Sequence, residues 1–258
     1  MKPSRRKIEE ALNAVGLHPV MISLYRATLG RKRAANEKLL RDFYAPLLKD
    51  TRLIFDIGAN LGKLASVFSS LGARVIAVEP NNDCVRHIQI CYPEVEVLQA
   101  VAGPKDSLAT LNVSDSMDAT SSLSNDWINS IRSCHTNWDV WNRKVTVPMF
   151  RLDTLIEHYG FPDYIKIDVE GFEEGVLAGL SRCPRLLSFE YNLCFTAAAY
   201  RCITNPIFSG ARFNYTMGEN ESFQSPEWMS AEELVATISK FKRGDVYGDI
   251  FVKTVVRG

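Results

Sequence analysis

Two carboxylates, Asp168 and Glu170, have the spacing that proton-transfer chemistry requires. They stand two positions apart at the end of the apolar run YIKIDVE (164–170). Because alternate side chains of a strand share a face, a strand that continues through both would place them together, with Lys166 one pleat earlier to offset their charge. Repulsion between like charges raises one pKa, which suits a general base. We therefore predict Asp168 and Glu170 as catalytic residues. The alternative is that Glu170 caps the following helix and Asp168 holds a backbone amide.

The same pair could instead bind Mg²⁺, with Glu190 at the end of the next strand as a third oxygen ligand. No third acid stands in the same run as the pair, so we predict no metal site. The four histidines are scattered singly, which argues against zinc, and the six cysteines contain no CxxC pair. We expect these cysteines to be free thiols.

A glycine loop follows the first apolar run in FDIGANLG (55–62), which contains Asp56, Gly58, Asn60 and Gly62. A dinucleotide loop counted from Gly58 would need glycine at positions 60 and 63, which are asparagine and lysine, and the chain has no Walker A run. The NAD, FAD and ATP classes are therefore excluded by spacing.

The loop suits a ligand that has an adenosine and a cationic amino-acid tail but no pyrophosphate. Asp56 offers a carboxylate to an ammonium group, and Glu79, at the end of the second apolar run, can accept hydrogen bonds from ribose hydroxyls. Together these groups predict S-adenosylmethionine as the cofactor. The alternative is that both acids only cap helices and that the glycines only make a tight turn.

The elements that position these residues read as an α/β sheet. Short runs buried on both faces alternate with helix-length connectors. We expect about seven strands, over 52–57, 74–79, 95–100, 164–170, 185–192, 211–216 and 248–255.

Charge separates the first fifty residues from the rest. Residues 1–50 carry a net charge of +6, and because the 258-residue chain has a net charge of zero, residues 51–258 carry −6. We expect a helical extension of two or three amphipathic helices over 1–50 and one catalytic domain over 51–258. Zero net charge argues against a nucleic-acid partner. No apolar run reaches membrane-span length and no signal peptide is visible, so we expect a cytoplasmic protein.

The polar segment 115–142 is longer than an ordinary connector and contains Trp127, Trp138 and Trp141. Aromatic faces among hydrogen-bonding side chains suit a sugar, so we predict that these tryptophans bind the acceptor. The alternative is that Trp138 and Trp141 fasten the segment to the sheet.

Five motifs together resemble the FkbM family of S-adenosylmethionine-dependent methyltransferases. They are FDIGANLG, AVEPN, QAVAG, the SSL of 121–123 and YIKIDVEGFE, and the resemblance covers about residues 52–192. It implies the class I methyltransferase fold, a Rossmann-like, mostly parallel seven-stranded sheet with an antiparallel last strand. It also implies, in most cases, O-methylation of sugars or natural-product hydroxyls.

The resemblance also implies roles for individual residues. The loop residues Asp56 to Gly62 would hold the methionine end of the cofactor, Glu79 and Asn81 would hold the ribose and flank the adenine, and Gln99, Ala100 and Val101 would border the adenine. We predict an O-methyltransferase whose acceptor is a hydroxyl of a sugar, glycan or similar polar metabolite. A nucleic-acid methyltransferase and a non-catalytic S-adenosylmethionine-binding module are the alternatives. The sequence does not predict an oligomeric state.

Overall fold

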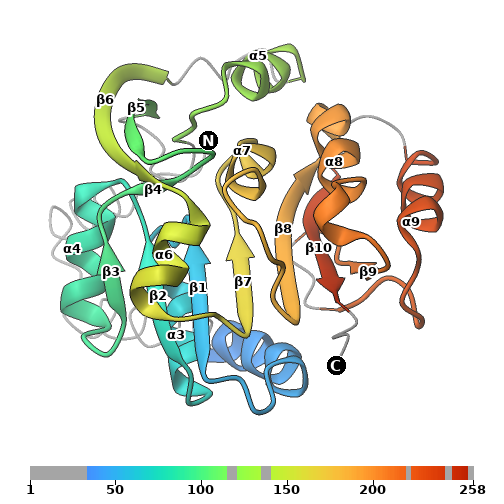
Figure 1. Cartoon of the computed structure of the whole chain (residues 1–258), viewed down its shortest axis with the longest axis horizontal. Helices are drawn as coiled ribbons and strands as arrows, with labels where there is room; N and C mark the ends of the chain where they lie inside the picture. Colours follow the sequence, from blue (N-terminus) through green and yellow to red (C-terminus); the bar gives the residue numbers. More distant parts are fainter. Residues whose placement is uncertain (1–33, 115–120, 135–140, 219–221, 242–245, 255–258) are drawn as a thin grey trace, which may run out of the picture.

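The computed structural model describes residues 34–114, 121–134, 141–218, 222–241 and 246–254. Its centre is a seven-stranded sheet in the order β3-β2-β1-β7-β8-β10-β9 (Figure 1). The strands are β1 (Leu53–Ile57), β2 (Arg74–Val78), β3 (Glu96–Leu98), β7 (Tyr164–Ile167), β8 (Leu186–Asn192), β9 (Arg212–Tyr215) and β10 (Tyr247–Lys253).

Strand directions agree with the expected fold. The pairs β3–β2, β2–β1, β1–β7 and β7–β8 are parallel, whereas β10 is antiparallel to both β8 and β9. This confirms the predicted α/β sheet of seven mostly parallel strands with an antiparallel last strand. The carboxyl ends of the parallel strands therefore share one edge, where the glycine loop meets the end of the run 164–170.

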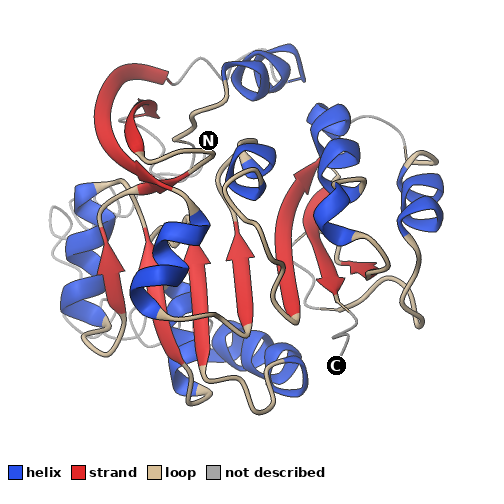
Figure 2. Cartoon of the chain, viewed as in Figure 1, coloured by secondary structure: helices blue, strands red, loops and turns tan. Residues whose placement is uncertain are grey.

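Helices cover both faces of the sheet (Figure 2). Along β1, Phe55 and Ile57 belong to one buried cluster and Ile54 to another, because successive side chains point to opposite faces. Burial on both sides explains why these strands read as near-continuous apolar runs. The helices of this domain are α3 (Lys63–Ser70), α4 (Asn82–Cys91), α6 (Leu152–Tyr159), α7 (Glu173–Leu177), α8 (Thr196–Ile203) and α9 (Ala231–Ile238), with short 3₁₀ turns at η2 (Leu193–Phe195) and η3 (Pro206–Phe208).

The described part of the N-terminal region is a helix over residues 34–47. Its residues Leu40 and Tyr44 are buried, and the Tyr44 ring meets the Phe68 ring edge-on with 5.0 Å between centroids. The helix therefore packs on the sheet through an apolar stripe. The other helices expected before it lie outside the described residues. No helix in the described part of the chain is long and apolar enough to cross a membrane.

A second, three-stranded sheet stands near the carboxyl ends of the main strands (Figure 1). It contains β4 (Val101–Ala102), β5 (Ser107–Ser114) and β6 (Trp141–Phe150) in the order β4-β6-β5, with α5 (Asn125–Cys134) between β5 and β6. The sequence pattern indicated a polar insertion over 115–142 and gave no sign of the strands on either side of it, β5 and β6.

Candidate active site

Two cavities meet at the carboxyl ends of β1, β2, β7 and β8. The first, of about 240 Å³, is bordered by the glycine loop, the end of β2, the segment after β3 and the loop after β7; its lining includes Gly58, Asn60, Glu79, Ala100, Val101, Asp168, Glu170 and Glu190. The second, of about 330 Å³, lies under the N-terminal helix and is lined by Leu40, Tyr44, Asp56, Gly58, Ala59, Asn60, Leu61, Lys63, Leu64, Lys166, Asp168 and Asp249. Three residues, Gly58, Asn60 and Asp168, line both.

The glycine loop has a backbone that few residues could adopt. Gly58, Asn60 and Gly62 have φ angles of 84°, 50° and 73°, all in the left-handed region. A Cβ on Gly58 would overlap the carbonyl oxygen of Asp168. The glycine therefore lets the loop after β1 contact the loop after β7. The two residues at this contact, Gly58 and Asp168, line both cavities.

Asp56 fits the expected cationic end of the cofactor. Its side chain is 2% exposed, and its Oδ2 atom has no hydrogen-bond partner. Burial raises the pKa of Asp56 to about 7, although Lys166 opposes the rise and the carboxylate also accepts a hydrogen bond from the Ala65 amide at the start of α3. Asp56 thus makes one contact with a helix, as a structural role predicts. Its buried Oδ2 atom still lacks a hydrogen-bond partner, which an ammonium group could supply.

Glu79 lines the first cavity and holds two amides of the surrounding loops. Its Oε2 accepts a hydrogen bond from the Asn60 amide and its Oε1 accepts one from the Asn81 amide, both at 2.8 Å. Burial raises its pKa, which these amides partly oppose. Each carboxylate oxygen can accept a second hydrogen bond, so two acceptor positions remain for ribose hydroxyls.

Three other predicted cofactor residues do not appear among the described residues that line the two cavities: Gly62, Asn81 and Gln99. The Asn81 side chain caps α4 by accepting from the Asp83 amide at 2.9 Å, and Gln99 donates to the Pro80 carbonyl at 3.4 Å. The side chains of Asn81 and Gln99 therefore stabilise loops around the first cavity.

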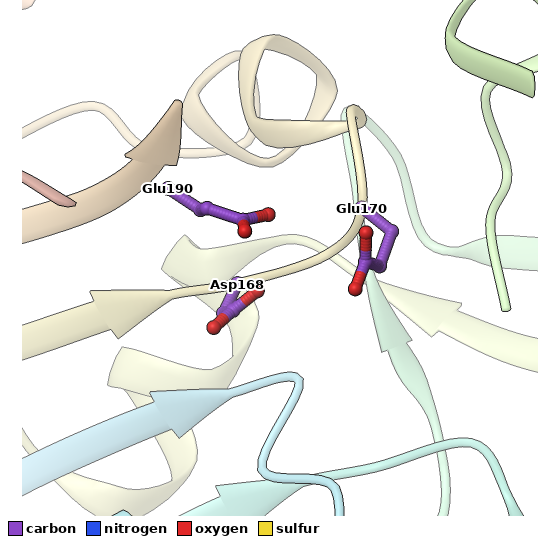
Figure 3. A group of neighbouring side chains, drawn as sticks. All are labelled: Asp168, Glu170 and Glu190. Carbon is purple, nitrogen blue, oxygen red and sulfur yellow. The ribbon is translucent and has the colours of Figure 1, made fainter. Parts of the chain in front are cut away.

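The predicted catalytic pair lies together, but not through the strand geometry that the sequence suggested. β7 ends at Ile167, so the strand does not continue through Glu170, whose φ is 54°. The prediction of a strand over 164–170 was therefore wrong at its end. The turn still brings Asp168 and Glu170 close to Glu190 of β8, with one oxygen of each within 4.8 Å of the others (Figure 3).

Two members of this carboxylate cluster, Glu170 and Glu190, have a raised pKa. Burial raises the pKa of Glu170 well above its usual value, and the charges of Asp168 and Glu173 add to the rise. Burial likewise raises the pKa of Glu190, again reinforced by Asp168. The cluster can therefore exchange a proton with a bound hydroxyl, and its oxygens also have the composition of a Mg²⁺ site.

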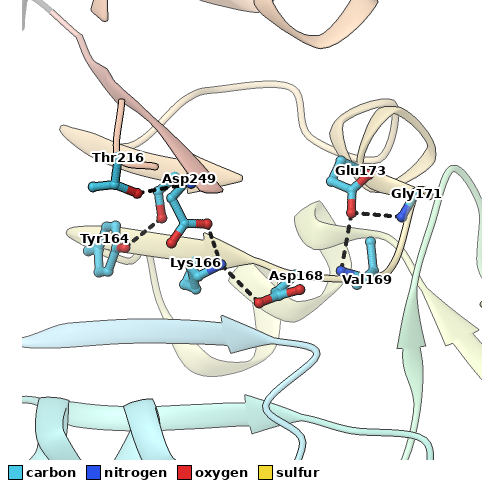
Figure 4. A network of polar contacts seen from close by, with 9 residues as sticks. Tyr164, Lys166, Asp168, Val169, Gly171, Glu173, Thr216 and Asp249 are labelled. Carbon is cyan, nitrogen blue, oxygen red and sulfur yellow. Dashed lines mark hydrogen bonds and ion pairs between the residues drawn. The ribbon is translucent and has the colours of Figure 1, made fainter. Parts of the chain in front are cut away.

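A buried cation fixes one side of the cluster. Lys166 is 1% exposed, and its Nζ lies 3.2 Å from Oδ2 of Asp168 and 2.8 Å from Oδ1 of Asp249 (Figure 4). Burial lowers the pKa of Lys166, but attraction to these two carboxylates outweighs it and the pKa ends well above its usual value. Lys166 offsets charge as predicted. Sequence reasoning missed Asp249, which reaches the site only because β10 pairs with β8.

Two of the three tryptophans predicted to bind the acceptor, Trp127 and Trp141, lie within the described residues. Trp127 is 3% exposed in a cluster with Ile128 and Ile131, and its ring meets that of Trp141 edge-on at 5.7 Å. This burial favours a packing role for Trp127, a role that the sequence pattern suggested only for Trp138 and Trp141. Trp138 lies outside the described residues. Two residues of the SSL motif, Ser121 and Leu123, line the first cavity instead, although their spacing alone gave no reason to place them there.

The site can be compared with known proteins. A family model described as the methyltransferase FkbM domain matches residues 56–238. No curated protein matches the sequence. Among solved structures, a precorrin-6y C5,15-methyltransferase from Geobacter metallireducens GS-15 is 13% identical, with a TM-score of 0.43 and 86% of this chain and 87% of that chain covered.

The plantazolicin methyltransferase BpumL in complex with SAH is 12% identical, with a TM-score of 0.44 and 93% and 92% of the two chains covered. A SAM-dependent methyltransferase from Archaeoglobus fulgidus is 14% identical, with a TM-score of 0.40 and 86% and 94% covered. These similarities are too distant to bear on the acceptor. The family model spans most of the chain, and the chain therefore belongs to the FkbM methyltransferase family, whose members transfer a methyl group from S-adenosylmethionine.

Proposed function

We propose that the protein methylates a hydroxyl group of a sugar, glycan or similar polar metabolite. The observation that carries this proposal is the carboxylate cluster of Asp168, Glu170 and Glu190 beside the cavity that the glycine loop borders. An alcohol must lose its proton when it attacks a methyl group, so an O-methyltransferase needs a proton acceptor at this place.

The cofactor residues divide between the two cavities. S-adenosylmethionine, when bound, supplies an electrophilic methyl group on a sulfonium. Asp56 lines the second cavity and has a buried oxygen without a hydrogen-bond partner, so it would hold the ammonium of the amino-acid tail. Glu79 would accept from the ribose hydroxyls, while Ala100 and Val101 offer an apolar border to the adenine in the first cavity.

Asp168 is the proposed general base. Its side chain is 38% exposed, so an acceptor can reach it, and Lys166 fixes the orientation of its Oδ2 atom. The hydroxyl proton would pass to the Asp168 carboxylate as the hydroxyl oxygen attacks the methyl group, and Lys166 would then keep its ion pair with Asp249. Burial raises the pKa of Glu170 and of Glu190, and in their protonated forms both can donate hydrogen bonds to oxygen atoms of the acceptor.

Charge supports an uncharged acceptor over a polyanion. Residues 51–258 carry a net charge of −6, and the Asp168 carboxylate stands at the site itself. A phosphate backbone would be repelled here unless cations lined its path. A polar, neutral acceptor such as a sugar carries no such penalty.

The test is transfer of tritium from labelled S-adenosylmethionine into a panel of glycans, nucleosides and RNA. We expect label in a glycan or small polyol, and loss of that label in Asp168→Asn. Label confined to RNA or nucleosides would overturn the acceptor class. Intact calorimetric binding of S-adenosylhomocysteine with no transfer to any acceptor would support the binding-module alternative. Inactivation by EDTA with rescue by Mg²⁺ would assign the cluster to metal binding.

A further inference from the structure

The loop that carries Glu170 has an unfavourable backbone conformation that other parts of the chain must hold. Glu170 has a φ of 54°, and Gly171 follows at 85°. A residue with a Cβ adopts the left-handed region only where its surroundings over-determine it. Glu170 itself belongs to neither neighbouring element, because β7 ends at Ile167 and α7 begins at Glu173.

One restraint comes from Ser122, in the segment between β5 and α5. Its Oγ donates to the Glu170 carbonyl oxygen at 2.6 Å. The same Oγ accepts from the Ser124 amide at 2.9 Å, which leaves the hydroxyl proton for Glu170. Ser122 is 1% exposed, and its own amide and carbonyl pair with Asn112 of β5 at 3.0 Å. The hydroxyl is thus anchored on the second sheet.

A second restraint comes from α5. A Cβ on Gly171 would overlap Cβ, Cγ and Cδ1 of Trp127, so the tryptophan packs directly on the glycine backbone. On the opposite side of the loop, Oε1 of Glu173 accepts from the Val169 and Gly171 amides at 3.3 and 3.1 Å (Figure 4). The turn is therefore clamped between the second sheet with α5 and the first turn of α7.

We propose that Ser122 is a positioning residue that holds the Glu170 carboxylate against Asp168 and Glu190. The hydroxyl does not touch the reacting atoms; it fixes the backbone turn from which the carboxylate projects. This couples the second sheet, with α5, to the carboxylate cluster. The inference rests on the proposed function only in assigning Glu170 a part in methyl transfer.

The first test needs no acceptor. Hydrogen–deuterium exchange of the full chain would follow the Val169 and Gly171 amides in Ser122→Ala, with Ser239→Ala as the matched control. The Ser239 Oγ also donates to a backbone carbonyl, that of Ala236 at 3.0 Å, but at the end of α9 and outside the restraints on the Glu170 turn. We expect exchange about five- to tenfold faster in Ser122→Ala, the effect of losing one intramolecular hydrogen bond, and little change in the control.

Ser122→Cys guards against a folding defect, because it has a similar size and keeps a weak donor. Its exchange should lie between those of the wild type and Ser122→Ala. Wild-type exchange in Ser122→Ala, or equal acceleration in Ser239→Ala, would overturn the proposal.

The second test is a double-mutant cycle on methyl transfer to whichever acceptor the wild type labels. Ser122→Ala should lower kcat and leave the KM for S-adenosylmethionine unchanged. In a Glu170→Gln background it should have little further effect, because both changes act through one carboxylate. Additive losses would overturn the positioning role. Wild-type turnover in Glu170→Gln would show that Glu170 takes no part in methyl transfer. If the wild-type protein labels no acceptor, the proposed function is refuted, and the hydrogen–deuterium exchange experiment alone tests whether Ser122 holds the turn.

Discussion

Asp56 provides the sharpest test of cofactor placement, because its protonation and its ligand compete. Its Oδ2 atom has no partner and its pKa is raised to about 7 by burial, so the carboxyl is partly protonated at neutral pH. An ammonium group next to it is stabilised only by the ionised form. Binding of S-adenosylhomocysteine, which carries the same amino-acid tail, should therefore release a proton and strengthen as the pH rises.

The magnitude follows from the pKa. At pH 6, one unit below it, about a tenth of the Asp56 carboxyl is ionised, and at pH 8 about nine tenths is. If only the ionised form binds well, affinity should rise about tenfold between these values, which corresponds to about 1.4 kcal/mol. The number of protons released should fall from about 0.9 at pH 6 to about 0.1 at pH 8, as the ionised fraction requires.

Calorimetry at pH 6, 7 and 8, in buffers with different ionisation enthalpies, measures both quantities. Asp56→Asn should bind more weakly at pH 8 and lose the pH dependence, whereas Asp83→Asn, which removes an exposed carboxylate from α4, should keep it. An affinity that does not change with pH, or an unaltered slope in Asp56→Asn, would refute the assignment of Asp56 to the ammonium.

Four other outcomes follow from the same contacts. Without ligand, Asp56→Asn should be more stable than the wild type at pH 8 by up to about 4 kcal/mol. The raised pKa of Asp56 in the folded state gives the wild type a stability contribution that is complete below about pH 4 and is lost as the pH rises through 7. Equal denaturant midpoints for the two proteins at pH 8 would contradict this. Glu79→Ala should weaken S-adenosylhomocysteine binding by about 1–3 kcal/mol, since it also strands two amides, and unchanged calorimetric affinity would remove Glu79 from the site. Trp127→Ala should lower the free energy of unfolding by about 3–5 kcal/mol in urea titrations, whereas a small loss with a raised acceptor KM would restore the stacking role. Asp168→Asn should slow transfer by roughly 10²–10⁴-fold with cofactor affinity within a few-fold of wild type, and wild-type turnover would sink the base assignment.

The parts of the fold that the sequence predicted are those buried on both faces. All four residues of β7 are buried, and such strands appear as unbroken apolar runs. β5 and β6 gave no such signal. The first four residues of β5 alternate between half-buried and exposed, and β6 begins with polar residues in WNRK. A small sheet with one solvent-facing side cannot be distinguished from a polar insertion by apolar content alone.

The site was predictable where it depends on local sequence and unpredictable where it depends on register or backbone strain. Gly58 and Asp56 lie in one motif at the end of one strand. Asp249 becomes a partner of Lys166 only through the antiparallel pairing that sets Asp249 opposite Glu190. The proximity of Asp168 and Glu170 was predicted, but from a strand that ends too early; a left-handed residue produces it instead.

Methyl transfer requires a fixed relation between the methyl donor and the group that accepts the proton, because the reacting atoms must meet in line at about 3–3.5 Å. Backbone contacts join the two loops that would carry these groups. The Asp168 amide donates to the Ile57 carbonyl at 2.8 Å, and the Asp168 carbonyl occupies the space that a Cβ on Gly58 would need. The glycine loop and the carboxylate loop are therefore a single packed unit, and Asp168 lines both cavities. A side chain at position 58 would displace the glycine loop and the proposed base Asp168 together, because a Cβ there would overlap the Asp168 carbonyl oxygen. The contact between the two loops therefore depends on the glycine and on no charged side chain.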